Sequence, residues 1–326
     1  MNALRVRAES WPVRGLWTIS RGSVTEIDVV VVELEADGVV GRGECRPYPR
    51  YGESVESVIA AVEALAEEIA HGLDRQGLQR ALPPGAARNA VDCAFWDLEA
   101  KRAGHRVWQL LGLSPPRPVA TAYSLSLDSA EAMGRNAAQN AERPMLKLKL
   151  AGPDDLARVE AVRANAPRTR LIVDANEGWS LDDFVRLAPK LDVLGVELIE
   201  QPLPAGQDAV LATLHRPVPV CADESCHDTA SLADLAGRYD AVNIKLDKTG
   251  GLTEALKLED AARAQGFTVM MGSMLSTSLA IAPATLLAQN AAVVDLDGPL
   301  LLARDRDHGL RYDGSLVYPP EPELWG

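Results

Sequence analysis

The feature that most constrains the fold is a series of eight short apolar runs that begins after residue 118. The runs end roughly every 25 residues, which leaves room for one strand, one helix and two loops in each repeat. This regular spacing predicts a barrel of parallel strands, whereas a doubly wound open sheet would use fewer strands and usually a glycine-rich first turn. The runs are residues 119–125, 145–150, 171–174, 196–200, 218–223, 241–246, 267–271 and 293–297.

The chain before these runs has a different pattern. Residues 24–35 are long and β-branched, and Asp37-Gly38 separates them from residues 39–44, which predicts a β-hairpin. Residues 54–70 and 86–102 repeat apolar side chains at helical spacing. Strands followed by helices indicate an α+β unit.

Prolines and the end of the chain divide the sequence further. Pro115, Pro116 and Pro118 mark a boundary, and no full helical pattern follows the eighth run. The predicted organisation is an α+β capping domain over residues 1–115, a barrel over 116–299 and a C-terminal segment over 300–326. That last segment is rich in proline, glycine and charge, and we expect it to return to the capping domain.

Composition excludes several classes of partner. The 326 residues include 46 acidic and 33 basic side chains, so the net charge of −13 opposes nucleic acid or an anionic membrane surface. Residues 264–294 lack charge, but Gly272, several hydroxyl side chains and Pro283 divide them into a strand, a loop and a helix over about 278–289.

The location of the protein is predicted from two further features. The first twenty residues carry several charges and no unbroken apolar core, so we expect no signal peptide. The four cysteines lack zinc-type spacing, and a cytoplasmic protein is the default expectation. The sequence shows no apolar surface that would identify a subunit interface, so the oligomeric state stays open and a homo-oligomer is possible.

Two lysines end the second run. Lys147 and Lys149 share one face of the predicted strand, while the leucines beside them face the helices. Two ammonium groups facing a barrel interior repel each other, so we expect the pKa of either to be lowered. The alternative is an ordinary solvated edge strand, which the flanking apolar residues disfavour.

Three consecutive runs end in carboxylates, namely Asp174, Glu200 and Asp223. Acids grouped at the ends of adjacent strands repel one another unless a cation joins them, and all-oxygen ligands suit Mg²⁺ first and Mn²⁺ second. Three separate salt-bridge partners are the alternative. Asn176 and Glu224 lie just beyond these ligands and are candidates for supporting them.

The sixth run supplies another lysine. Asn243 and Lys245 share a strand face, whereas Lys248 falls in the expected turn, so Lys245 is the better catalytic candidate. The second and sixth strands of an eight-stranded barrel lie opposite each other. Lys149 and Lys245 would therefore lie on two sides of a molecule bound at the metal.

With these residues in place, the chain resembles the enolase superfamily, its muconate-lactonizing-enzyme subgroup, and within it the dipeptide epimerases acting on L-Ala-D/L-Glu. The closer likeness rests on Arg21, on Asp295-Leu296-Asp297, and on residues 46–53 and 85–90. The subgroup motifs are Lys147-Leu148-Lys149, Asp174-Ala175-Asn176, Glu200-Gln201-Pro202, Ala222-Asp223-Glu224-Ser225 and Asn243-Ile244-Lys245.

This resemblance implies an α/β fold, a modified (β/α)7β TIM-type barrel covered by the α+β capping domain. It implies that Arg21 binds the distal carboxylate of a dipeptide, and that Asp295 and Asp297 bind its ammonium group. The residues alone leave a solvated loop arginine and a helix or turn cap as alternatives.

The implied reaction is a Mg²⁺-assisted proton transfer at the α-carbon of a small dipeptide. Lys149 and Lys245 would remove and return the proton from opposite faces, and Lys147 would stabilise the enediolate. The hypothesis is therefore epimerisation of L-Ala-D/L-Glu, in the recycling of cell-wall peptides.

Three alternatives stay open. One is a different subgroup reaction: N-acylamino acid racemase, muconate cycloisomerase or o-succinylbenzoate synthase, whose substrates lack a free ammonium. The second is a dipeptide epimerase of other specificity, because the preference for glutamate is inferred from Arg21 alone and Leu279 could reshape the pocket. The third is a binding or structural protein on a retained barrel, which the intact lysines and carboxylates disfavour.

Overall fold

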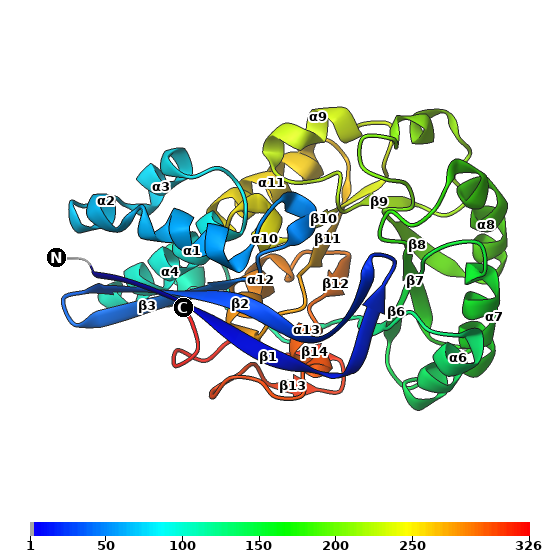
Figure 1. Cartoon of the computed structure of the whole chain (residues 1–326), viewed down its shortest axis with the longest axis horizontal. Coiled ribbons are helices and arrows are strands. Elements are labelled where there is room, and N and C mark those ends of the chain that lie inside the picture. The colour runs from blue at the N-terminus through cyan, green and yellow to red at the C-terminus, as the bar shows by residue number, and fades with distance from the viewer. Residues whose placement is uncertain (1–2) are drawn as a thin grey trace.

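The computed structural model describes residues 3–326, which form an N-terminal antiparallel sheet with helices and an eight-stranded parallel barrel (Figure 1). The N-terminal sheet has the order β1-β2-β3, from Ala3–Ile19, Gly22–Ala36 and Val39–Cys45. Its helices are α1 (Val55–Glu63), α2 (Ala66–Ala70), α3 (Arg75–Ala81), α4 (Ala86–Ala103) and α5 (Val107–Leu110).

The hairpin signal at Asp37-Gly38 is confirmed, because β2 and β3 pair across it. Strand β1 was not predicted; of its side chains only that of Val13 is fully buried, and the rest are exposed or half-buried. It also predicted one helix over 54–70, where the structure has α1 and α2, and nothing in the sequence pattern marks this interruption. The helix predicted over 86–102 is confirmed as α4.

Helix α4 packs closely on β3 because two glycines of that strand face it. A methyl group on Gly41 would lie 2.3 Å from the Ala94 carbonyl oxygen, and one on Gly43 would lie 2.1 Å from that of Ala90. The sheet can therefore approach the helix backbone, and Val30, Val32 and Leu34 fill the core between sheet and helices.

The barrel strands follow the predicted runs in chain order. Strand β5 closes the barrel against β12, where the Ala122 N–H donates to the Val294 carbonyl at 2.8 Å. The strands are β5 (Tyr123–Leu125), β6 (Met145–Lys149), β7 (Arg170–Asp174), β8 (Val196–Glu200), β9 (Val220–Ala222), β10 (Ala241–Ile244), β11 (Thr268–Gly272) and β12 (Val293–Asp295).

The first run, 119–125, is not one strand. Its start is β4 (Val119–Ala120), which joins a small sheet with β14 (Leu316–Val317) and β13 (Tyr312–Asp313), whereas its end is β5. The small sheet brings the C-terminal segment beside the start of the barrel. Further along, the Trp325 indole donates to the Cys93 carbonyl of α4 at 3.0 Å.

The connections between barrel strands are less uniform than one helix each. The link from β8 to β9 has a 3₁₀ helix at Ala209–Thr213, in a segment with prolines 202, 204, 217 and 219, which lack the N–H groups that a helix needs. The α-helices are α6 (Ala130–Gln139), α7 (Asp155–Asn165), α8 (Leu181–Val193), α9 (Leu232–Leu235), α10 (Leu246–Thr249), α11 (Leu252–Ala264), α12 (Ser278–Leu287) and α13 (Gly298–Leu301).

The uncharged stretch 264–294 contains β11, a loop and α12, as predicted. Among residues 3–326, no helix combines the length and the apolar character needed to cross a membrane.

The N-terminal domain covers one end of the barrel. The hairpin of β1 and β2 reaches across to β6 and β7 (Figure 1), and its turn contacts the segment after β7, since the Ser20 hydroxyl donates to the Asn176 carbonyl at 2.7 Å. At the other side α4 meets Gly250-Gly251, where a methyl group on Gly251 would lie 2.5 Å from the Asp92 side chain. The mouth of the barrel therefore lies under the cap.

Candidate active site

One layer of small and apolar side chains sets the position of the site. Every strand of the barrel, with Ala122 just before β5, sends one such side chain into a single interior cluster. Side chains alternate along a strand, so the next residues on this inner face lie two and four positions further along. The cluster is Ala122, Met145, Ile172, Leu198, Cys221, Ala241, Met270 and Val293.

The predicted site residues occupy those next positions. Two steps beyond the cluster come Lys147, Asp174, Glu200, Asp223 and Asp295, and four steps beyond it come Lys149, Lys245 and Asp297. Ser124 and Asn243 fill the same level on β5 and β10. The period of the strands therefore brings residues far apart in sequence onto one inner face at the carboxyl ends of the strands, where barrels of this kind carry their sites.

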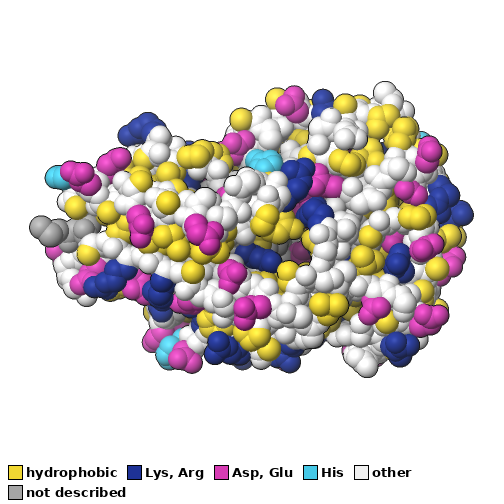
Figure 2. Space-filling model, viewed as in Figure 1, with side chains coloured by type: hydrophobic (Ala, Val, Ile, Leu, Met, Phe, Trp, Pro, Cys, Tyr) yellow, Lys and Arg dark blue, Asp and Glu magenta, His cyan; other side chains and the backbone are white. Residues whose placement is uncertain are grey.

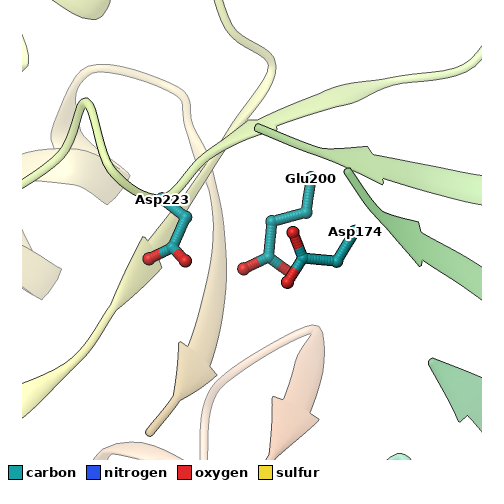
Figure 3. A group of neighbouring side chains, drawn as sticks. All are labelled: Asp174, Glu200 and Asp223. Carbon is teal, nitrogen blue, oxygen red and sulfur yellow. The ribbon is translucent and has the colours of Figure 1, made fainter. Parts of the chain in front are cut away.

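Asp174, Glu200 and Asp223 point toward one another from adjacent strand ends (Figure 3), and all three are buried. Each offers one carboxylate oxygen to a group in which all three oxygens lie within 4.8 Å of one another. Three convergent carboxylates without histidine or cysteine fit a hard divalent cation. The predicted metal ligands are thus brought together.

Asn243 orients one of these ligands. Its amide donates to Glu200 Oε1 at 2.7 Å, and Gly272 on the neighbouring strand leaves the space that this amide occupies. A methyl group on Gly272 would lie 2.5 Å from Asn243 Oδ1.

Gln201 orients Asp223, another of the predicted ligands, and was not among the residues predicted from the sequence. Its Oε1 accepts hydrogen bonds from the Asp223 N–H at 2.9 Å and the Ser225 N–H at 3.1 Å. Gln201 has a positive φ of 34°, and its amide is held in turn by the Tyr239 hydroxyl at 2.9 Å. The only sequence signal was its place beside Glu200.

Lys147 lies among the carboxylates. Its ammonium nitrogen is 2.6 Å from Glu200 Oε2, 2.6 Å from Asp295 Oδ2 and 3.3 Å from Asp174 Oδ2. Burial would lower the pKa of Lys147, but these carboxylates raise it well above its ordinary value. The expected lowering is therefore wrong for Lys147 in this arrangement, because carboxylate attraction outweighs the repulsion between neighbouring lysines.

Lys149 and Lys245 face the same space from β6 and from the end of β10, the second and sixth strands of eight. Lys149 pairs with Asp174 at 2.6 Å and Lys245 with Asp223 at 2.7 Å. The pKa of Lys245 is raised, since Asp223 and Glu200 outweigh the effect of burial. The lysine geometry is as expected, whereas the lowered pKa is not found for Lys245 either.

Lys248 has a different position. It lies in α10 rather than in a turn, is fully buried, and donates to Asp223 Oδ1 at 2.6 Å and to the Asn243 carbonyl at 2.9 Å. It supports the carboxylate from behind and does not line the cavity described below.

These cations also act on the carboxylates. Burial would raise the pKa of Asp223, but Lys245 and Lys248 hold it well below its ordinary value. The nearby lysines compensate the charge of Glu200 less fully, so burial and the neighbouring Asp174 raise its pKa to about 7. In this arrangement the lysines supply the positive charge that three grouped acids require.

The two residues expected to support the ligands lie at the same rim. The Asn176 N–H donates to Asp174 Oδ1 at 2.9 Å, and its amide approaches Glu224 Oε1 at 3.5 Å. Among the described residues, Asn176 Oδ1 and Glu224 Oε2 have no hydrogen-bond partner. Both residues line the cavity, and these two buried oxygens are unsatisfied acceptors beside it.

Arg21 lies in the two-residue turn between β1 and β2, above the carboxyl end of β7. Its guanidinium contacts Glu224 at 2.8 Å, Glu177 at 3.3 Å and the Tyr48 hydroxyl at 3.0 Å. Although burial lowers the pKa of Arg21, Glu224 and Tyr48 raise it above its ordinary value. Arg21 thus lies at the mouth of the barrel, as predicted. Its charge is already neutralised by Glu177 and Glu224, and neither pairing was predicted from the sequence.

Asp295 and Asp297 are both buried at the end of β12. Asp297 accepts the Ser124 N–H at 2.6 Å, and burial together with Asp295 raises its pKa to about 7. Asp295 pairs with Lys147, so it is tied to the metal-ligand group as well as to the mouth of the barrel. Ser124, which also approaches Asp295 Oδ1 at 3.4 Å, was not identified from the sequence.

These residues surround a cavity of about 570 Å³ between cap and barrel. Figure 2 shows Lys and Arg side chains beside a hollow near the middle of this face. The cap contributes Trp17, Ile19, Tyr48 and Tyr51, and the barrel contributes Lys149, Lys245, Asp295 and Asp297.

Two family models match the chain. Residues 1–112 match the N-terminal domain of mandelate racemase and muconate lactonizing enzyme. Residues 130–321 match the enolase C-terminal domain-like family. Together they cover the cap and most of the barrel.

Two relatives match nearly the full chain. L-Ala-D/L-Glu epimerase of Escherichia coli is 47% identical over 314 residues, which cover 96% of this chain and 98% of that protein. N-acetyl-D-glutamate racemase of a Pseudoalteromonas species is 43% identical over 300 residues, covering 91% and 95% of the two chains.

Two solved structures share the fold over nearly the whole chain. One is an enolase family member from Agrobacterium tumefaciens with homology to dipeptide epimerases, with bound sodium and L-Ala-L-Glu; it is 56% identical, covers 100% of both chains and has a TM-score of 0.98. The other is the dipeptide epimerase of Enterococcus faecalis with Mg and L-Leu-L-Tyr, which is 29% identical, covers 98% and 97% of the two chains and has a TM-score of 0.90.

Proposed function

The chain belongs to the enolase superfamily, and from this membership we propose that it is an isomerase, a dipeptide epimerase that inverts the α-carbon of the C-terminal residue of L-Ala-D/L-Glu. The observation that carries the proposal is the placement of Lys149 and Lys245, which line one cavity from opposite sides of the barrel beside three carboxylates.

Asp174, Glu200 and Asp223 would hold Mg²⁺, with Mn²⁺ as a substitute, because their oxygens converge and no softer ligand is among them. A bound divalent cation would draw electron density from the substrate carboxylate and, by its charge, favour the neutral form of nearby lysines. Asn243 and Gln201 hold two of the ligands in place.

Proton transfer is assigned to the two lysines on the cavity wall. A neutral Lys149 or Lys245 removes the α-proton from one face, and the ammonium of the other returns a proton from the opposite face. Lys147 contacts Asp174 and Glu200, and from this position its positive charge stabilises the enediolate oxygen. The α-carbon is inverted when removal and return use different lysines.

The two ends of a dipeptide meet opposite charges. Asp295 and Asp297 would bind the terminal ammonium, and Arg21 lies at the mouth where a distal carboxylate would arrive. Two described carboxylates already contact Arg21, so the substrate would share it with Glu224 and Glu177.

A second candidate function, racemisation of an N-acylated glutamate, is favoured by one observation. Asp295 pairs with Lys147 at 2.6 Å, so this carboxylate has a role even when the substrate carries no ammonium. N-acetyl-D-glutamate racemase is also among the relatives above 40% identity. The lysines and metal ligands would serve both reactions.

We assign the cap to residues 1–115, the barrel to 116–299 and the returning segment to 300–326. A cytoplasmic location is supported by four buried cysteines that form no disulfide, and the reaction would serve the recycling of cell-wall peptides.

Proton NMR in D₂O tests the proposal. The purified protein is incubated with Mg²⁺ and, separately, with L-Ala-L-Glu, L-Ala-D-Glu and N-acetyl-L-glutamate. Loss of the glutamate α-proton with appearance of the other diastereomer is expected for the dipeptides, and EDTA should abolish it. Faster turnover of N-acetylglutamate would establish the second candidate, and no exchange with any substrate would refute both.

A further inference from the structure

Five cationic side chains line the cavity between cap and barrel. Four of them form ion pairs with carboxylates within the described part of the chain. Arg46 is the exception, because no carboxylate of residues 3–326 lies within ion-pair distance of its guanidinium. The five are Arg21, Arg46, Arg50, Lys149 and Lys245.

The contacts of Arg46 leave most of its donors available. A guanidinium has five N–H donors, and within residues 3–326 only the bond from Nη1 to the Leu275 carbonyl, at 3.1 Å, is formed. The Tyr48 ring lies 5.9 Å from its central carbon. Burial lowers the pKa of Arg46, and nearby charges do not restore it. An incompletely compensated cation in a cavity wall attracts an anion.

Arg46 is also held firmly in position. It follows β3, and its backbone N–H donates to Asp247 Oδ1 at 3.1 Å, while the Asn89 amide holds the same oxygen at 2.8 Å. Asp247 lies two residues after Lys245. Because both its backbone and its guanidinium are bound to the barrel, Arg46 loses little conformational freedom when a ligand binds.

Arg21 and Arg46 flank Tyr48, but they differ in net charge. Arg21 and Arg50 face Glu177 and Glu224, so this side of the mouth carries two cations and two anions. The Arg46 side carries one cation for which residues 3–326 supply no ion-pair partner. A substrate anion therefore gains more from Arg46 than from a guanidinium that it must share.

We propose that Arg46 is the specificity-determining residue that binds the distal carboxylate of the substrate, with Arg21 in a supporting position. The inference rests on the proposed function and deepens it. The preferred substrates are those whose reacting residue carries a second carboxylate, rather than a neutral side chain of the same size.

The test compares L-Ala-L-Glu with L-Ala-L-Gln, which differ by one charge and almost nothing in shape. Exchange of the α-proton in D₂O gives kcat/KM for the protein and for Arg46→Met, Arg46→Lys and Arg170→Met. Arg46→Met should lower the ratio of kcat/KM for glutamate over glutamine by about tenfold or more. Arg46→Lys should recover part of this preference, and Arg170→Met, which removes an exposed, paired cation at the start of β7, outside the cavity, should leave it nearly unchanged.

An equal loss on both dipeptides in Arg46→Met would mean that Arg46 only anchors the cap, and an unchanged ratio would also overturn the inference. Calorimetric titration of both dipeptides into the protein and Arg46→Met, with Mg²⁺ present, separates the two proposals. Absent turnover together with an Arg46-dependent preference for the glutamate dipeptide would refute the proposed function and keep the inference. Binding without such a preference, or no binding of either dipeptide, would refute the inference.

Discussion

The Lys147 ammonium lies 2.6 Å from Asp295 Oδ2 and 2.6 Å from Glu200 Oε2, so one buried lysine joins the last barrel strand to the cluster of three convergent carboxylates. The sequence motifs containing these residues are far apart and suggest separate roles, one for the metal and one for the substrate ammonium. In the folded barrel they form a single charged network. In the proposed reaction Asp295 would therefore act through Lys147 as well as through any contact with the substrate.

The two aspartates of β12 and the segment after it should differ when each is changed to asparagine. Asp295→Asn removes a partner of Lys147, so turnover of both L-Ala-L-Glu and N-acetyl-L-glutamate should fall. Asp297→Asn should lower turnover of the dipeptide only, because Asp297 is assigned to the ammonium group, which N-acetyl-L-glutamate lacks. Steady-state kinetics with both substrates measures this difference, and equal effects of Asp297→Asn on the two would show that Asp297 does not bind the ammonium.

Replacing either cavity lysine should separate proton exchange from inversion. In Lys149→Ala and Lys245→Ala, epimerisation should fall by about 10²–10⁴-fold, the usual contribution of a positioned acid or base. Each variant should still exchange the α-proton of one diastereomer, and the two variants should prefer opposite ones. The measurement is NMR in D₂O with Lys257→Ala as control, since Lys257 is exposed on α11. Full inversion rates in both variants would rule out the two-lysine reaction.

Dipeptide turnover should depend on pH through Asp297. Burial and the nearby Asp295 raise its pKa to about 7, so below that pH the group is neutral and attracts an ammonium poorly. The value of kcat/KM for L-Ala-L-Glu should therefore rise as pH increases from 5.5, reach half its maximum near the pKa and level off about one pH unit above it, because kcat/KM follows ionisation of the free enzyme. Asp297→Asn should remove this rise, and its persistence in that variant would assign it to another group.

The contact between cap and barrel should depend on Arg306. Its guanidinium binds Glu44 at 2.6 Å, and Glu44 is 1% exposed, so Arg306→Met would leave a buried carboxylate without its cation. The expected loss is about 3–5 kcal/mol of unfolding free energy at pH 7, and less at pH 5, because burial raises the pKa of Glu44 and the group can take up a proton.

Urea unfolding measures this loss, with Arg5→Met as the matched control. Arg5 is also paired with glutamate, but it is exposed, and such surface pairs contribute about 0–1 kcal/mol. Similar losses in the two variants would show that the Glu44–Arg306 pair does not hold the cap to the barrel.

Prediction of the fold succeeded where a pattern is local. The eight runs are confirmed as the eight parallel strands, apart from residues 119–120, which join another sheet. Strand β1 was missed even though Arg5, Arg7 and Glu9 alternate with apolar residues, a pattern that suits an exposed edge strand. The break between α1 and α2 has no local signal.

The sequence by itself determined which residues could share the inner face of the barrel, because side chains alternate along every strand and each run ends at the same level. This was enough to group the three carboxylates and to set Lys149 opposite Lys245. Only the tertiary structure decided how the charges pair. Ion pairs depend on side chains approaching within a few ångströms across strands and domains, and no spacing along the chain encodes that distance. Hence Arg21 is neutralised by Glu224, Lys147 reaches Asp295, and Arg46 lines the cavity with no ion-pair partner among residues 3–326.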